Sequence, residues 1–92
     1  MMKKILENKT ILVTGTARGI GHAMVKIFAA QGANLIAHAR KDCIEHRDFC
    51  KDVSQKEGIQ IVPIYCDLTK QDEIKNTFKE IQLRAGEMAQ WL

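Results

Sequence analysis

The sequence lacks the features that mark secreted, fibrous or membrane-spanning proteins. Its three cysteines are odd in number and show no CxxC spacing, which argues against a disulfide framework or a zinc site. With one proline and six glycines among 92 residues, the chain is neither collagen-like nor of low complexity. No apolar run approaches the ~20 residues of a membrane span, and polar residues soon interrupt the N-terminal segment where a signal peptide needs an apolar core. These absences predict a cytoplasmic globular protein without a membrane partner.

Aromatic residues are also scarce, at 5% of the chain, and the basic residues are scattered, so nucleic acid is not an expected partner. The net charge of +3 permits an anionic ligand. The hydrophobic fraction of 46% and the charged fraction of 27% are ordinary for a folded domain, and 92 residues allow one hydrophobic core.

Apolar patterns of two periods alternate along the chain. Short apolar runs indicate strands, and apolar residues at helical spacing indicate amphipathic helices. The predicted order is a strand at 10–14, a helix at 19–31, a strand at 34–38, a helix at 42–57, a strand at 60–66 and a third helix with apolar residues at Ile74, Phe78 and Ile81. Strands that alternate with helices predict a parallel sheet with right-handed crossovers.

The same patterns predict which residues are buried. The strand at 10–14 has no polar alternation, so we expect it to be buried on both faces. Cys43 and Cys50 are seven residues apart and should pack on one face of the second helix. Pro63 cannot donate to a ladder, so the third strand should lie at or near a sheet edge, or Pro63 should begin its paired part. The core-facing stripe expected of the first helix consists of Ile20, Ala23, Met24, Ile27 and Phe28.

Local signals predict the helix ends. Gly32 and Gly58 suit the left-handed position that ends the first and second helices. Asp42 is the expected N-cap of the second helix. Thr69 and Asp72 have the spacing of a capping box at the start of the third helix.

Three glycines in the spacing Gly-x-x-x-Gly-x-Gly lie between the first predicted strand and the first predicted helix. Gly15 allows a tight turn, Gly19 allows a pyrophosphate to approach the backbone, and Gly21 allows the helix to pack closely on the strand. The N–H groups at the helix start then face the phosphates. This context favours a dinucleotide-binding loop over a glycine-rich turn without a ligand. The loop residues are Gly15, Thr16, Ala17, Arg18, Gly19, Ile20 and Gly21.

The end of the second predicted strand bears on which dinucleotide binds. A site for NAD uses an Asp or Glu there, which binds the ribose 2′-OH and would repel a 2′-phosphate. This sequence has Arg40 and no acid at the strand end, and the planar guanidinium suits phosphate. Arg18 is a second cation that could reach the same group. The pattern favours NADP(H), and the alternative is a pair of solvated arginines.

Four further polar residues have less specific signals. Asp67 ends the third predicted strand, where it could accept a hydrogen bond from an adenine amino group or cap the following helix. His38 and His46 have no partner at catalytic spacing and are expected at the surface or in packing. His22 is expected on the exposed side of the first helical turn.

The motif Thr14-Gly15-x-x-x-Gly19-Ile20-Gly21, followed by Gly32-Ala33 and by Cys66-Asp67-Leu68, resembles the N-terminal part of a short-chain dehydrogenase/reductase. The resemblance covers about residues 9–81 and is greatest to the 3-oxoacyl-(acyl-carrier-protein) reductase-like group. It implies a partial Rossmann-type three-layer α/β fold with three βα units and the sheet order 3-2-1. It also implies that residues 1–82 form an NADP-binding half-domain.

The resemblance assigns roles at the site. Gly15, Arg18, Gly19, Ile20 and Gly21 would line the pyrophosphate and the adenosine ribose. Other positions would meet the ends of the cofactor: Arg40 the 2′-phosphate, and Asp67 with Leu68 the adenine.

The chemistry of this family needs motifs that the sequence lacks. Members continue to an Asn-Asn-Ala-Gly strand end, a catalytic Ser and a Tyr-x-x-x-Lys pair. Tyr65 is the single tyrosine, lies in the third predicted strand and has no Lys four residues on, so we assign no catalytic residue. Residues 83–92 are an atypical tail that extends the third helix or trails away, as in a truncated or frameshifted gene.

We therefore expect the cofactor-binding part of an NADPH-dependent oxidoreductase that reduces a small carbonyl or acyl-carrier-protein-linked substrate by hydride transfer. The alternative is a non-catalytic nucleotide-binding or interaction fragment. A methyltransferase of Rossmann type is a third candidate, but it usually has an acid at the end of its second strand. In the sheet order 3-2-1, the first strand has an open edge, which predicts self-association.

Overall fold

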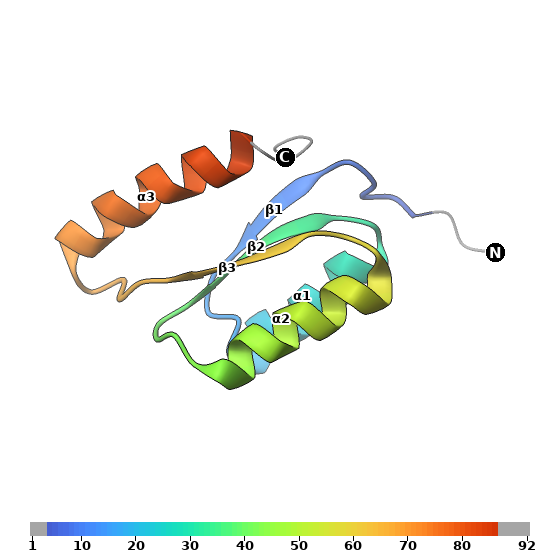
Figure 1. The fold of residues 1–92 in the computed structure, drawn as a ribbon, viewed down its shortest axis with the longest axis horizontal. Coiled ribbons are helices and arrows are strands. Elements are labelled where there is room, and N and C mark those ends of the chain that lie inside the picture. Colours follow the sequence, from blue (N-terminus) through green and yellow to red (C-terminus); the bar gives the residue numbers. More distant parts are fainter. Residues whose placement is uncertain (1–3, 87–92) are drawn as a thin grey trace.

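The structure is a computed structural model that describes residues 4–86. Three strands alternate with three helices, as the sequence predicts (Figure 1). Residues 83–86 continue the third helix, and the rest of the predicted tail lies outside the described residues. The elements are β1 (Thr10–Val13), α1 (Gly19–Ala30), β2 (Asn34–Ala39), α2 (Ile44–Glu57), β3 (Ile61–Tyr65) and α3 (Gln71–Gly86).

The three strands form a parallel sheet in the order β1-β2-β3, which confirms the predicted 3-2-1 order. β2 is central, and Thr10 pairs with Asn34 at the start of the β1–β2 ladder. Pro63 lies in β3, at an edge of the sheet. α1 and α2 cover one face and α3 lies on the other (Figure 1). This is a partial Rossmann-type α/β fold in three layers.

The core lies mainly between the sheet and the α1–α2 layer. Val25 and Ala29 of α1 are completely buried against Leu35 and Ala37 of β2 and Cys50 of α2. The opposite face holds a smaller cluster, in which Ile36 and Ile64 contact Ile81 of α3.

The predicted core stripe of α1 is wrong in part. Ile20 and Ile27 are 80% and 60% exposed, and Ala23 is also exposed. Met24 and Phe28 do pack on the core, but the completely buried positions are one residue further along, at Val25 and Ala29. The face of α1 that meets the core is therefore centred on Val25 and Ala29, and Ile20 and Ile27 lie outside it.

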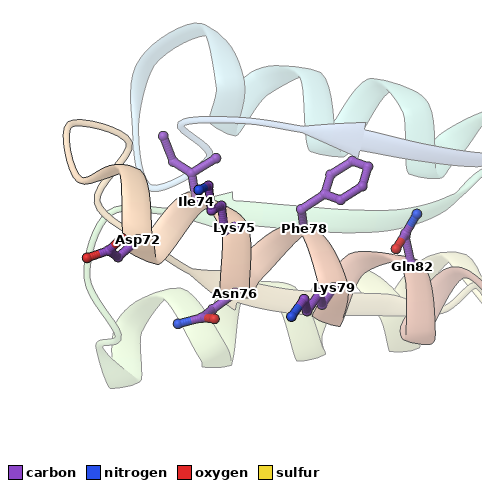
Figure 2. A pocket seen from close by; sticks show the side chains of 7 residues that line it. All are labelled: Asp72, Ile74, Lys75, Asn76, Phe78, Lys79 and Gln82. Atoms are coloured by element: carbon purple, nitrogen blue, oxygen red, sulfur yellow. The ribbon is translucent and has the colours of Figure 1, made fainter.

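The prediction that the first strand is buried on both faces is also wrong, because Leu12 is 40% exposed. Leu12 faces an apolar groove of about 180 Å³ between the sheet and α3, which Ile74 and Phe78 also line. Figure 2 shows Ile74 and Phe78 projecting from α3 toward β1, and Phe78 is 59% exposed. Of the predicted α3 stripe, only Ile81 packs on the core.

The ends of α1 and α2 agree with the sequence at their glycines and differ at the start of α2. Gly32 and Gly58 have φ values of 91° and 68°, the left-handed conformation that follows a helix. The N-cap of α2 is Cys43, which is exposed, so Asp42 is not the cap and Cys43 does not pack. Asp42 instead accepts two hydrogen bonds from the Arg47 guanidinium, at 2.6 and 2.7 Å.

The predicted capping box at α3 is not formed. Thr69 donates its N–H and its hydroxyl to Oδ1 of Asp67, at 2.9 and 2.7 Å. The hydroxyl therefore serves a turn before α3, which begins at Gln71. Among the described residues, no helix is long and apolar enough to cross a membrane.

Substitutions of Ile81 and Phe78 test how α3 packs on the sheet, because the first contacts the core and the second is mostly exposed. Ile81→Ala should lower the free energy of unfolding by roughly 1–2 kcal/mol, because Ile81 contacts the buried Ile36 and Ile64. Phe78→Ala removes a larger side chain but should change it by under about 0.5 kcal/mol, because Phe78 is mostly exposed. Urea unfolding followed by circular dichroism measures both. A larger effect from Phe78→Ala would contradict this packing of α3.

Candidate functional site

The glycine loop between β1 and α1 has the backbone conformation that its glycines predict. Gly15 and Gly19 have φ values of 63° and 65°, which side chains rarely adopt. A Cβ on Gly21 would lie 2.7 Å from the carbonyl carbon of Gly15, so α1 starts in direct contact with the loop. The space where a Gly19 Cβ would stand is open. The predicted roles of Gly15 in the turn and Gly21 in close packing are confirmed.

The N-terminus of α1 has no side-chain cap. Its N-cap residue, Arg18, has extended backbone and makes no capping hydrogen bond, and the first turn contains no acidic residue. Ala17, Arg18 and Ile20 are all exposed around it. The N–H groups of a first turn and the positive end of the helix dipole attract anions. The residues therefore fit a phosphate group at this position.

Thr16 lies in the same loop but is completely buried. Its N–H and its hydroxyl both donate to the carbonyl oxygen of His38, at 2.8 and 3.0 Å. Nε2 of His46 lies 2.6 Å from the hydroxyl oxygen. Thr16 thus supports the loop from behind, and the prediction that it contacts a ligand stays a prediction.

His38, near the end of β2, supports the neighbouring residue. The N–H of Gly15 donates to Nδ1 of His38 at 3.2 Å, and Nε2 donates to the carbonyl oxygen of Cys66 at 2.9 Å. A main-chain N–H can only donate and a carbonyl can only accept, so these partners assign the ring proton to Nε2. Of the two roles predicted for His38, at the surface or in packing, the structure shows the second, because His38 is 6% exposed. Nothing in its sequence spacing identifies this contact with the loop.

His46 is buried on α2, with the Tyr65 hydroxyl 2.8 Å from Nδ1. Burial, followed by the charges of His22 and Arg47, lowers the pKa of His46 below its ordinary value of 6.5. Burial also raises the pKa of Tyr65 to about 12. The predicted exposure of His22 is wrong, because its ring stacks on Phe49 with centroids 3.8 Å apart.

Arg40 and Asp67 follow β2 and β3 and lie close together, with 3.6 Å between a guanidinium nitrogen and Oδ2. The Arg40 side chain is 71% exposed, whereas that of Asp67 is 16% exposed. Hydrogen bonds from Thr69 lower the pKa of Asp67. Asp67 therefore holds the turn before α3, and Leu68 beside it is 52% exposed.

The sheet brings these groups to one edge. Thr16 is bonded to His38, and the N–H of Cys66 donates to the carbonyl of Ala39 at 3.1 Å, so the segments after the three strands are neighbours. The glycine loop, Arg40 and Asp67 therefore share the carboxyl edge of the parallel strands, where ligands of open α/β sheets bind. Within residues 4–86, no group of three His, Cys, Asp or Glu side chains could hold a metal ion.

Comparisons with known proteins agree with this geometry. A family profile described as short chain dehydrogenase matches residues 9–89. An uncharacterised oxidoreductase of Schizosaccharomyces pombe is 36% identical over 77 residues, which are 84% of this chain and 29% of the relative. A tropinone reductase homologue of Arabidopsis thaliana is 35% identical over 81 residues, 88% of this chain and 30% of the relative. The chain thus spans less than a third of these relatives.

Solved structures match the fold. An alcohol dehydrogenase from Thermococcus sibiricus, complexed with 5-hydroxy-NADP, has a TM-score of 0.77 at 25% identity, over 85% of this chain and 33% of that one. The L-sorbose reductase of Gluconobacter frateurii, complexed with NADPH and L-sorbose, has a TM-score of 0.75 at 21% identity, over 88% of this chain and 30% of that one.

The lowered pKa of His46 predicts a pH dependence of stability. Below pH 6.5 the unfolded chain takes up a proton at His46 before the folded chain does. The contribution of His46 to the free energy of unfolding should therefore be constant near pH 8 and fall as the pH drops through 6.5 toward the folded-state pKa. The slope is at most about 1.4 kcal/mol per pH unit for one proton.

Urea unfolding at a series of pH values, with wild type and His46→Gln, measures this slope. The variant should lose the part of the slope that His46 contributes, whatever its stability at pH 8. The titratable and charged groups that face His46 are His22, His38, Asp42, Arg47, Cys50 and Tyr65. Equal slopes for the two proteins would show that His46 does not titrate differently on folding.

Proposed function

The chain belongs to the short chain dehydrogenase family, and on that premise we propose that it is the NADP(H)-binding part of an oxidoreductase. The observation that carries the proposal is the uncapped start of α1 behind the glycine loop, at the same sheet edge as Arg40. Residues 1–82 are the proposed binding region.

The proposed pyrophosphate site is the loop of Gly15–Gly21. Main-chain N–H groups at the start of α1 would donate to the phosphate oxygens, and the open space at Gly19 leaves room for them. Exposed Ala17, Arg18 and Ile20 would line the ribose and pyrophosphate. No side-chain carboxylate stands in the first turn to repel an anion.

Arg40 is the proposed partner of the 2′-phosphate. Arg40 forms an ion pair with Asp67 in which a guanidinium nitrogen lies 3.6 Å from a carboxylate oxygen, and the Arg40 side chain is exposed. Exposed ion pairs contribute about 0–1 kcal/mol to stability. A phosphate can therefore compete for the guanidinium at little loss of stability. Asp67 would then accept from the adenine amino group through an oxygen, with Leu68 against the ring.

The oxidoreductase reaction itself is proposed for a longer protein of this kind. NADPH supplies a hydride when it is bound, and the proposed substrate is a small carbonyl compound, with a 3-oxoacyl-carrier-protein thioester as the specific candidate. Carbonyl reduction also needs a proton donor at the carbonyl oxygen. The chain's residues in this account bind and orient the cofactor.

A second candidate function is nucleotide binding without catalysis, and Tyr65 favours it for this chain alone. Tyr65 is the single tyrosine, its hydroxyl is bonded to buried His46, and its pKa is raised to about 12. An acid that must give up a proton near neutral pH needs the opposite shift.

We also propose a cytoplasmic location. The three free cysteines support it, because a reducing compartment keeps thiols from forming disulfides.

We also propose that the chain self-associates through β1. Among the described strands β1 is an edge strand, and apolar Leu12 and Phe78 are exposed beside it. An unpaired apolar edge is a template for pairing with another chain.

The cofactor proposal predicts that Arg40 makes the protein bind NADPH more tightly than NADH. Wild type should bind NADPH about tenfold or more tightly than NADH, because a charge-assisted hydrogen bond contributes ~1.5–3 kcal/mol. Arg40→Ala should remove this preference and leave NADH affinity unchanged. Fluorescence titration of both nucleotides measures it, with Lys26→Ala on exposed α1 as a charge-matched control. Unchanged NADPH affinity in Arg40→Ala would refute the assignment.

Self-association predicts a sedimentation coefficient that rises with concentration across the micromolar range. Leu12→Lys places a charge at the edge and should reduce the rise. Sedimentation velocity measures both proteins. A wild-type monomer with a single cooperative unfolding transition at micromolar concentration would contradict the proposal.

A further inference from the structure

A chain of hydrogen bonds crosses the buried side of the glycine loop. The Tyr65 hydroxyl lies 2.8 Å from Nδ1 of His46, and Nε2 of His46 lies 2.6 Å from Oγ1 of Thr16. Oγ1 of Thr16 lies 3.0 Å from the carbonyl oxygen of His38. The four groups come from β3, α2, the loop and β2, so these hydrogen bonds connect the loop to three elements other than the two that flank it.

The donors and acceptors fix the direction of this chain. The carbonyl oxygen of His38 can only accept, so the Thr16 hydroxyl donates to it. The Thr16 oxygen then accepts from the protonated Nε2 of His46, which leaves Nδ1 to accept from the Tyr65 hydroxyl. Every hydrogen bond therefore points from β3 toward β2. A neutral imidazole with its proton on Nε2 satisfies all of them.

This series of hydrogen bonds holds the glycine loop at one residue only, Thr16. Thr16 is completely buried and His46 is 3% exposed, whereas Ala17, Arg18 and Gly19 on the other side of the loop are exposed. The main-chain N–H of Thr16 is also committed to His38, at 2.8 Å. The loop is thus anchored from behind and leaves the start of α1 free for a ligand.

We propose that Thr16, His46 and Tyr65 are positioning residues, which hold the glycine loop in the conformation that binds the pyrophosphate before any ligand arrives. The inference rests on the proposed function for the identity of the ligand. A loop held in its bound conformation loses less conformational entropy on binding. The three residues therefore raise the affinity for the ligand without contacting it.

The test compares two threonines of the same chemistry. Thr16→Val keeps the shape and removes the hydroxyl, Thr16→Ser restores the hydroxyl, and Tyr65→Phe removes the far end of the chain. Thr10→Val is the control, because the Thr10 hydroxyl is buried in β1 without a hydrogen-bond partner among the described residues. Two measurements are made on the full chain: NADPH affinity by titration, and the amide resonances of Gly19, Ile20 and Gly21 by NMR without nucleotide.

Thr16→Val and Tyr65→Phe should weaken NADPH binding by about three- to tenfold and shift the three loop amides. Thr16→Ser and Thr10→Val should resemble wild type in both measurements. In wild type, the ring nitrogen resonances of His46 should report a proton on Nε2. Equal affinity and unchanged loop amides in Thr16→Val would overturn the positioning role, even if Arg40 governs NADPH binding.

The two proposals fail in different ways. If wild type does not bind NADPH but Thr16→Val shifts the loop amides, the proposed ligand is wrong and the anchoring of the loop stands. If wild type binds NADPH and Thr16→Val binds it equally well with displaced amides, the loop is anchored but its conformation does not govern affinity, and the inference fails.

Discussion

The rest of the site depends on the hydrogen bonds between the glycine loop and the end of β2. His38 accepts the N–H of Thr16 at its carbonyl and the N–H of Gly15 at its ring. These two hydrogen bonds turn the chain away from β1 at the sheet edge and aim the first turn of α1 at the same edge. Arg40 follows two residues after His38, directly beyond β2, so one short segment at the end of β2 carries both the anchor of the loop and the cation.

Much of this arrangement could be predicted from the sequence because it follows from local rules. The three-glycine spacing predicts a tight turn at Gly15 and a close approach at Gly21, and the structure has both. The approach of a pyrophosphate at Gly19 stays a prediction. The alternation of strand and helix patterns specifies the parallel sheet, and its order agrees. At the site, the loop, Arg40 and Asp67 each follow a strand, and parallel strands bring such segments to one edge of the sheet.

The predictions that were wrong concern features that depend on contacts between residues far apart in sequence. The helical pattern of α1 could not show that the sheet lies against Val25 and Ala29 rather than Ile20 and Ile27. Thr69 has a capping spacing, but its hydroxyl donates to Asp67, which precedes it, and does not accept from an N–H of α3. His46 and Tyr65 reach Thr16 only because α2 and β3 fold against the loop, and no spacing along the chain encodes that meeting. The exposure of Leu12 could not be predicted for the same reason, because it depends on how far α3 lies from β1.

The central claim is that the uncapped start of α1 and Arg40 together hold the two phosphate-bearing parts of NADPH. A crystal structure of the chain grown with NADPH tests it most directly. The account predicts the pyrophosphate against the main-chain N–H groups at Gly19–Gly21, and the 2′-phosphate beside the Arg40 guanidinium, released from Asp67. NADPH bound elsewhere, or bound at the loop with Arg40 still paired to Asp67 and the 2′-phosphate in solvent, would contradict it.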